Sequence, residues 1–342
     1  MKKMLTIFIL LLSFFIEAQK SDFKHINFNK ADSIANSYKG SSLKNLPVLV
    51  YKLTNNLDTQ VEKFRSIHTW VCSNITSDHS FGETTLKKRK KYKNDSISFS
   101  KWNNQVLSKM FQKLLKEKKT ICSGYAYLIK ELTTLANITC KIVDGYSRTT
   151  SRNVGEIDFP NHSWNAVKLN GKWYLVDATM ASGYFNINTY KFVQDYNEGY
   201  FLASPNLFNK KNYPLNSKWL LSENKPTINQ FVKAPIVYGS AFKNAIIPLT
   251  PEKLKTKIRV DETIVFKFEI LDESKIKDMR LTISSGFSSK TIQANLFNCK
   301  NRILKLKNQF SKKGNYIVHF MVDKDIVFSY SIKVEKSKYK SL

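Results

Sequence analysis

The sequence has little cysteine. Four cysteines occur in 342 residues, and no two of them form a Cys-x-x-Cys pair. The thiols are too few for a disulfide framework, and the five scattered histidines show no metal-ligand spacing. The sequence also has no internal repeat and no glycine-rich nucleotide-binding loop. A disulfide-stapled fold, a metal centre and a nucleotide-binding domain are therefore not expected.

Arginine is also scarce, although the chain is strongly basic. The formal net charge is +28, and only seven of the 55 basic residues are arginine. Nucleic-acid binders favour arginine for its planar, bidentate fork, so lysine spread along the chain does not predict a nucleic-acid partner. The densest cluster, KKRKKYK from Lys87 to Lys93, is predicted to be a solvated loop. Binding of an anionic polymer or a membrane surface by this cluster is the alternative.

Long apolar runs are absent after the N-terminus. The chain begins MKKMLTIFILLLSFFIEAQ, where two lysines precede an apolar run from Leu5 to Ile16 and Ala18 offers a small residue for cleavage. This order is typical of a secretory signal, and the run is shorter than the ~20 residues of a membrane span. Residues 1–18 are therefore predicted to be a signal peptide, with an uncleaved anchor as the alternative. We expect a mature protein that is secreted, or periplasmic or at the cell surface, without a transmembrane segment.

Helical patterns fill the first part of the mature chain. Apolar residues recur at helical spacing over 61–75, where Asp58 is the predicted cap. A second helix is expected to begin at Ser98 or Ser100, and the basic segment between the two helices is interpreted as a loop. His68 lies on the apolar stripe of the first helix, so it is predicted to be a packed core residue.

Strand patterns follow from residue 137. Two apolar runs flank Asn170-Gly171, and this dipeptide is the strongest short-range signal of a β-hairpin. A helical half therefore meets a sheet half within residues 19–230, which is an α+β arrangement. Between 263 and 335, short alternating runs are separated by turn residues. This pattern predicts an all-β sandwich of immunoglobulin type over residues 235–336.

The predicted hairpin brings polar side chains together. Continuing the register of its two-residue loop places Trp164 opposite Asp177 and His162 opposite Thr179. Because side chains alternate across a strand, His162 and Asp177 should share a face as diagonal neighbours within side-chain reach. An aspartate that binds one ring nitrogen fixes the tautomer and leaves the other nitrogen to act as a base.

A lone cysteine stands at the start of the preceding apolar helix. In TICSGYAYL, from Thr120 to Leu128, Cys122 is followed by a small residue, a glycine and aromatics. The unpaired N–H groups and aligned dipoles of a helix N-terminus favour an anion, and a thiolate beside an imidazole there has a lowered pKa. Cys122, His162 and Asp177 would thus supply a nucleophile, a base and an orienting group.

These segments resemble the transglutaminase-like superfamily. The resemblance is carried by TICSGYAYLIKELTTLANITCKIVDGYSR, NHSWNAVKLNGKWYLVDATMASG, YFLASPNLF and YPLNSKWLL, and it looks closest to the kyphoscoliosis peptidase branch. It covers about residues 60–222 and implies a papain-like core with catalytic Cys122, His162 and Asp177. The neighbouring residues expected to bind substrate are Gly124, Tyr125, Trp164 and Asn165.

The resemblance implies acyl transfer through a thioester on Cys122. The backbone N–H of Cys122 would be one oxyanion donor, and Trp102 and Gln105 are candidates for a side-chain donor. The acyl group would pass from a protein or peptide substrate to water or to a lysine amine. No calcium-binding loop or acidic cluster is present, so no metal and no cofactor are expected. Three positions depart from the residues usual in the superfamily: Ser77 for Tyr, Met180 for Trp and Asn212 for His.

The sequence leaves two questions open. The same fold could serve as a non-catalytic or weakly catalytic module that binds a cell-envelope partner. Cys72 and Cys140 could pair in a disulfide, although buried free thiols at Cys72, Cys140 and Cys299 are the preferred interpretation.

Overall fold

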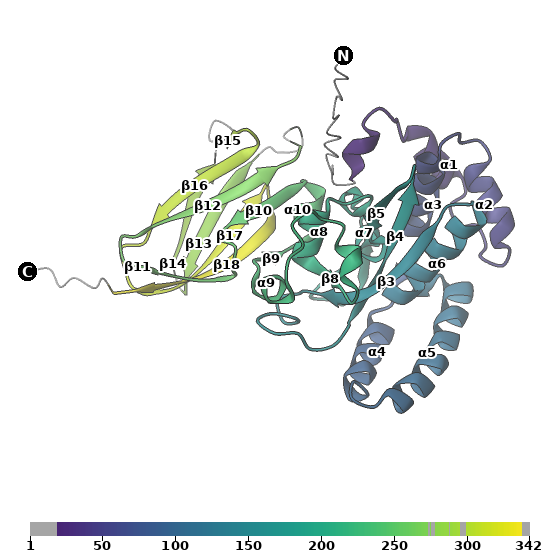
Figure 1. Cartoon of the computed structure of the whole chain (residues 1–342), viewed down its shortest axis with the longest axis horizontal. Coiled ribbons are helices and arrows are strands. Elements are labelled where there is room, and N and C mark those ends of the chain that lie inside the picture. Colours follow the sequence, from purple (N-terminus) through teal and green to yellow (C-terminus); the bar gives the residue numbers. More distant parts are fainter. Residues whose placement is uncertain (1–18, 273, 275–277, 287, 295–298, 337–342) are drawn as a thin grey trace, which may run out of the picture.

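The computed structural model describes residues 19–272, 274, 278–286, 288–294 and 299–336. The predicted signal peptide, residues 1–18, lies outside these residues. A part that mixes helices with a small sheet is followed by a part made mainly of strands, and the two lie side by side (Figure 1). Within the described residues, every helix is too short or too polar to span a membrane.

Helix α3 forms the buried centre of the first part. Phe64, Ile67 and His68 are fully buried along it, so His68 is a packed core residue as predicted. The cap is Thr59 rather than Asp58, because the Thr59 hydroxyl accepts from the Glu62 N–H while the Glu62 carboxylate accepts from the Thr59 N–H. The helices before the main sheet are α1 (Asn29–Ser37), α2 (Leu46–Thr54), α3 (Gln60–Asn74), α4 (His79–Lys91), α5 (Ser96–Glu117) and α6 (Cys122–Leu135).

The basic segment predicted to be a loop is helix α4, which corrects the sequence interpretation. The periodicity gave no signal because Thr85 is the only buried residue of this helix. An N-cap starts it instead: the Asp78 carboxylate accepts from the N–H of Phe81. Basic residues in its last turn suit the negative end of the helix dipole.

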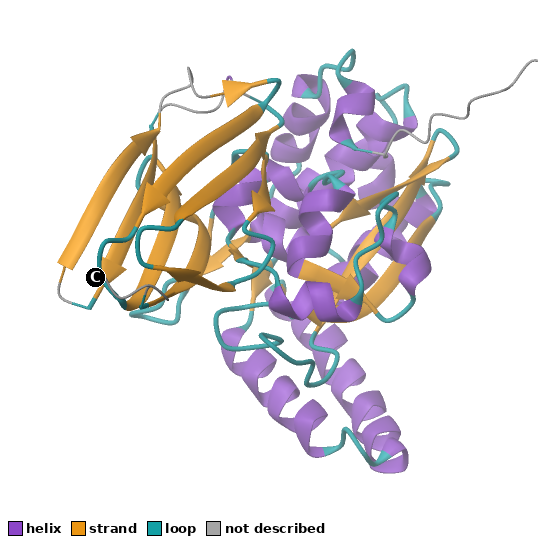
Figure 2. Ribbon diagram, turned by 60° about the vertical axis from the view of Figure 1, so that its left-hand side comes forward, coloured by secondary structure: helices purple, strands orange, loops and turns teal. Residues whose placement is uncertain are grey.

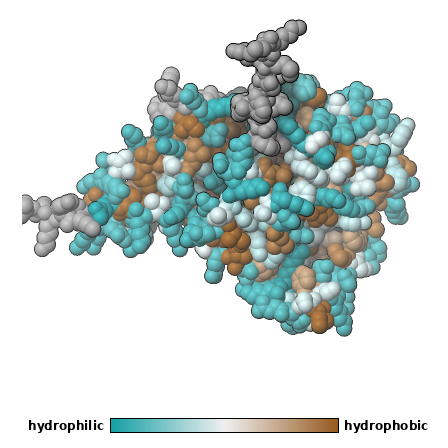
Figure 3. Space-filling view, in the orientation of Figure 1, coloured by the Kyte–Doolittle hydropathy of each residue, from teal (hydrophilic) through white to brown (hydrophobic). Residues whose placement is uncertain are grey.

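Helices α4 and α5 project together from the body of the molecule (Figures 1 and 2). Helix α5 begins at Ser96 rather than Ser98 or Ser100, because the Asp95 carboxylate accepts from the Ser98 N–H and caps the helix. On the face shown in Figure 3, hydrophobic residues form small separate patches, one of them at the tip of this projection. Ile97, at the start of α5, is 82% exposed.

A four-stranded antiparallel sheet in the order β5-β4-β3-β8 packs against α6. Strands β4 and β5 form the predicted hairpin, with φ of +48° at Asn170 and +84° at Gly171, as a type I′ turn requires. The predicted register holds from the turn as far as the pair Asn165–Val176, where the pairing ends. The strands of this sheet are β3 (Cys140–Ser147), β4 (His162–Leu169), β5 (Lys172–Val176) and β8 (Asn212–Pro214).

Beyond that point the chain turns into a short helix, so Trp164–Asp177 and His162–Thr179 are not strand pairs. Asp177 caps α7 by accepting from the Met180 N–H at 3.1 Å. The remaining elements of the first part are β1 (Thr76–Ser77), β2 (Lys119–Thr120), α7 (Ala178–Ser182), β6 (Gly183–Phe185), β7 (Phe192–Gln194), α8 (Pro205–Lys211) and α9 (Ile228–Lys233), with 3₁₀ turns η1 (Lys20–Phe23), η2 (Glu198–Tyr200) and η3 (Ser217–Leu220).

The C-terminal part is built from two sheets, consistent with an immunoglobulin-like sandwich. One sheet has the order β10-β12-β16-β15, and the other has the order β11-β18-β17-β13-β14 with β9 added to β18. Strand β12 alternates inward and outward residues, and its Phe268 stacks on Phe320 and Phe328 at 4.0 and 5.5 Å between ring centroids. The elements are β9 (Ile236–Val237), α10 (Gly239–Lys243), β10 (Ile246–Thr250), β11 (Lys255–Arg259), β12 (Thr263–Ile270), β13 (Met279–Ser285), β14 (Ser288–Ala294), β15 (Cys299–Lys300), β16 (Ile303–Gln309), β17 (Gly314–Val322) and β18 (Asp325–Glu335).

Candidate active site

Cys122 is the first residue of helix α6, as the sequence predicts. The Ile121 carbonyl accepts from the N–H groups of Gly124 and Tyr125 at 2.9 and 3.1 Å, so the helix starts directly after it. The first-turn N–H groups therefore face the end of the helix where Cys122 lies. Cys122 is partly exposed and lines a cavity of about 630 Å³, which we call the Cys122 cavity.

His162 and Asp177 meet beside this cysteine. His162 Nε2 donates to Asp177 Oδ2 at 2.6 Å, and the two side chains are 5% and 0% exposed. Because Nε2 is engaged, Nδ1 is the ring nitrogen left to act on the Cys122 thiol, whose pKa His162 lowers. Trp164 stacks on the imidazole at 5.9 Å between ring centroids and holds its orientation.

The local charges favour an ion pair between thiolate and imidazolium. Burial alone raises the pKa of Cys122, but the hydrogen bond and charge of His162, together with the charge of Arg89, lower it to about 7. Burial also lowers the pKa of His162, but the charge and hydrogen bond of Asp177, together with Cys122, raise it to about 10. Between these values the thiol is ionised while the ring carries the proton.

The residues predicted to bind substrate are all buried and do not line the Cys122 cavity: Gly124, Tyr125, Trp164 and Asn165. Instead, they hold in place the elements that carry the site. The Tyr125 hydroxyl donates to the Ile75 carbonyl at 2.8 Å and ties α6 to the end of α3. The Asn165 side chain donates to the Ala126 carbonyl at 2.9 Å and ties β4 to α6.

The predicted side-chain oxyanion donors also lie outside the Cys122 cavity. Trp102 packs on Tyr92 and Phe99 within the α4–α5 projection, at 6.2 and 5.8 Å between ring centroids. Gln105 is exposed. Both residues lie on α5, within the projection, and neither lines the cavity.

The walls of the cavity come from segments that the sequence did not assign to a site. Helix α4, the connection from β6 to β7 and the loop from β3 to β4 supply most of them. Of these three segments, the sequence draws attention only to α4, through the charge of its basic cluster. Ser77 and Met180, two of the three departures from the superfamily pattern, do line the cavity. Other lining residues are His79, Leu86, Arg89, Arg152, Phe185, Ile187 and Tyr190.

The other cysteines lie in the described part of the chain, and none of the four forms a disulfide. Cys72 and Cys140 are buried, and burial raises the pKa of both thiols. Cys299 is partly exposed rather than buried. No group of three or more potential metal ligands occurs among the described residues.

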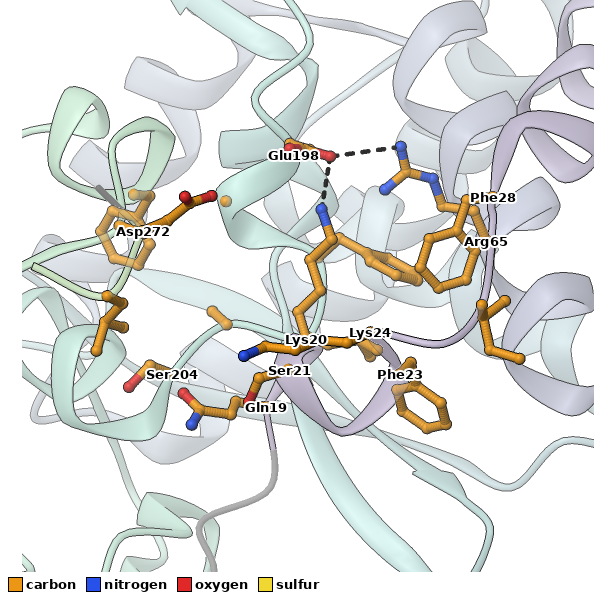
Figure 4. Close-up of a pocket in the computed structure, with 18 of the residues that line it drawn as sticks. Gln19, Lys20, Ser21, Phe23, Lys24, Phe28, Arg65, Glu198, Ser204 and Asp272 are labelled. Carbon is orange, nitrogen blue, oxygen red and sulfur yellow. Dashed lines mark hydrogen bonds and ion pairs between the residues drawn. The ribbon is translucent and has the colours of Figure 1, made fainter. Parts of the chain in front are cut away.

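A second cavity of about 760 Å³ lies beside the N-terminal segment, and Cys122, His162 and Asp177 do not line it. Figure 4 shows Glu198 between Lys20 and Arg65, at 2.7 and 3.8 Å. Arg65 also binds Asp32 through two hydrogen bonds of 2.7 and 2.9 Å. These four charged side chains pair with one another.

Comparison with known proteins identifies relatives of this chain. Residues 48–178 match the family model described as the transglutaminase-like superfamily. Human kyphoscoliosis peptidase is 34% identical over 230 residues, which cover 66% of this chain and 31% of that protein. The mouse kyphoscoliosis peptidase is 31% identical over 230 residues, with the same coverage. Hillarin of Drosophila melanogaster is 25% identical over 232 residues, covering 64% of this chain and 26% of that protein.

The chain thus spans less than a third of the length of these curated relatives. Among solved structures, a chain of the swine CD8αα homodimer is 14% identical, with a TM-score of 0.18, covering 27% of this chain and 97% of that chain. This similarity is too low to bear on the fold. The family match, in contrast, contains Cys122, His162 and Asp177. The chain therefore carries a domain of the transglutaminase-like superfamily and is a homologue of the kyphoscoliosis peptidases.

Proposed function

We propose that this protein is an exported cysteine enzyme that transfers acyl groups from protein or peptide amides. One observation carries the proposal: the His162 ring is hydrogen-bonded to the Asp177 carboxylate and lowers the pKa of the Cys122 thiol, and Cys122 and His162 both line a cavity. Export is proposed from the signal-like pattern of residues 1–18.

The reaction begins with attack of the Cys122 thiolate on an amide carbonyl. The N–H groups at the start of α6 stabilise the oxyanion that forms. The C–N bond then breaks, and the His162 imidazolium gives its proton to the leaving amine. The product on the enzyme is a thioester, and Asp177 keeps the ring oriented throughout.

A second nucleophile then releases the acyl group. His162 takes a proton from water or from a lysine amine as it attacks the thioester, and the Cys122 thiolate leaves. Water gives hydrolysis, whereas an amine gives a cross-link. The name peptidase carried by the mammalian relatives supports hydrolysis as the main outcome here.

The test distinguishes hydrolysis from cross-linking, and it also shows whether the protein is an enzyme. The protein is incubated with a glutamine-bearing protein and a labelled amine, and mass analysis scores backbone cleavage, deamidation and amine incorporation. We expect Cys122→Ala and His162→Ala to lower the rate at least about a thousandfold. Cys299→Ala, in the sandwich, is the control and should keep full activity. If Cys122→Ala works as well as the wild type, the enzyme proposal fails and a binding module is left.

A further inference from the structure

We infer that helix α4 selects the substrate of the proposed enzyme. The Cys122 cavity binds an extended segment with an acidic side chain against Arg89 and a large apolar side chain against the β6–β7 connection. This inference rests on the proposed function and names the class of acyl donor that the site takes.

The first support is the position of Arg89. Of the basic residues in the last turn of α4, it is the one that lines the Cys122 cavity. Its Nη2 donates to the hydroxyl of Ser123 at 3.4 Å, next to the reactive thiol. Its Nε is buried and has no hydrogen-bond partner among the described residues. A buried guanidinium N–H without a partner favours an anion nearby.

The second support is the balance of charge in the cavity. Two carboxylates line it, but each already has a cation. Asp78 pairs with Lys113, and Glu83 pairs with Arg152 at 3.2 Å. Among the described residues, no carboxylate lies within ion-pair distance of Arg89. The charge of Arg89 lowers the pKa of the Cys122 thiol, and acylation of Cys122 removes the negative charge of this thiolate. The cavity thus favours a further negative charge.

The third support is an exposed apolar wall at the other end of α4. His79, its first residue, contacts the rings of Phe185 and Tyr190 at 5.1 and 5.2 Å between centroids. Ile187 is 84% exposed and Tyr190 64% exposed, although both line the cavity. Apolar side chains gathered at the rim of a cavity indicate a binding surface.

The geometry also sets the spacing. Arg89 lies ten positions after His79 in α4, a rise of about 15 Å along the helix, which four to five extended residues span at ~3.3 Å each. The start of α6 lies along the middle of this path. A Cβ on Gly82 would lie 3.8 Å from the Ile121 side chain, and Ser123 contacts Arg89. The amide that reacts would therefore lie between the acidic and the apolar residue.

The experiment measures binding to the full chain carrying Cys122→Ala, so that no turnover is needed. Labelled peptides place a central glutamine between a phenylalanine and, about four residues away, Glu, Gln or Lys. The order is tested in both directions, and binding is followed by fluorescence anisotropy. The Glu peptide should bind about tenfold tighter than the Gln peptide, as a hydrogen bond to a charged group predicts. The Lys peptide should bind more weakly still.

Two substitutions on α4 locate the effect. Arg89→Gln should remove the preference for Glu, and Arg89→Lys, which keeps the charge, should retain part of it and remains informative if Arg89→Gln folds poorly. Lys87→Gln loses the same charge from an exposed side chain outside the cavity, so it should keep the preference. Equal binding of the Glu and Gln peptides overturns the inference. An equal loss of the preference for Glu in Lys87→Gln and Arg89→Gln overturns the inference too, because the preference would then come from the overall positive charge and not from Arg89.

The inference and the proposed function fail separately. Selective binding without turnover by the wild type would contradict only the proposed enzymatic function. Turnover without selective binding would contradict only the inferred role of Arg89.

Discussion

Cys122 and His162 act as one unit, because each sets the protonation of the other. The imidazolium is held by Asp177, whose second oxygen is occupied by the cap of α7. The carboxylate is therefore fixed on both sides, and the ring cannot rotate freely. Helix α7, which follows β5, therefore anchors the orienting group of the proposed triad as well as ending the strand.

We predict a bell-shaped dependence of kcat/KM on pH. Activity should rise as pH increases through about 7, where Cys122 loses its proton, because His162 lowers the pKa of this thiol. It should fall as pH rises through about 10, where His162 loses its proton, because Asp177 raises the pKa of this ring. Asp177→Asn should move the alkaline limb to lower pH.

Alkylation of Cys122 by iodoacetamide provides an independent measurement of the acid limb. The labelling rate should titrate with a midpoint near 7 rather than near the ordinary thiol value of 9.0. A midpoint near 9 in the folded protein would mean that no ion pair forms.

At the scale of elements, β3 must pass very close to its neighbours. Gly145 lies opposite His162 in the sheet. A Cβ there would lie 2.2 Å from the Tyr213 carbonyl oxygen and 2.6 Å from the Trp164 ring. Glycine is thus required by the close approach of β8 and of the ring that supports His162.

We predict that Gly145→Ala lowers the free energy of unfolding by about 1–3 kcal/mol, because the backbone of β8 and the buried Trp164 ring must move. The alkylation rate of Cys122 should fall as well, since His162 shifts with its strand. Urea unfolding and labelling measure the two effects. Gly82→Ala is the control for stability: the added Cβ meets only ordinary contact at 3.8 Å and improves helix propensity. Equal stability of the two variants would contradict the packing argument.

At the scale of the molecule, the sandwich is joined to the core through α10. Phe242 stacks on Tyr200 at 4.0 Å between centroids, and Asn197 donates to the Gly239 carbonyl at 2.8 Å. Tyr200 lies next to the site as well, because its carbonyl accepts from the Asp177 N–H at 3.2 Å. The sandwich therefore packs on the segment that lies behind the orienting carboxylate.

We predict that Phe242→Ala destabilises the core as well as the sandwich, by about 3–5 kcal/mol. All five tryptophans precede residue 230, so tryptophan fluorescence reports the first part of the chain alone. Its urea transition should shift to lower denaturant in the variant, because the core loses the packing of this ring. An unchanged fluorescence transition would show instead that the two parts unfold independently.

Local physics explains which parts of the fold and the site were predictable. The Asn170-Gly171 turn, the start of α6 at Cys122 and the alternation in β12 each depend on residues within a few positions. The proximity of His162 to Asp177 also followed from the hairpin register. Asp177, however, meets the ring as the N-cap residue of α7 and not as part of a strand pair. Helix α4 was not predicted, because its stability comes from a cap and its environment rather than from an apolar stripe.

The sequence was sufficient to predict the hairpin turn, the start of α6 and the three residues of the proposed triad, because turn chemistry, capping and periodicity act over short stretches of chain. Only the tertiary structure decided that Trp164 and Asn165 support the site from behind, that Arg89 turns toward the thiol, and that α4 and the β6–β7 connection form the walls. These facts depend on how distant segments pack against one another, and no short stretch of sequence contains that information.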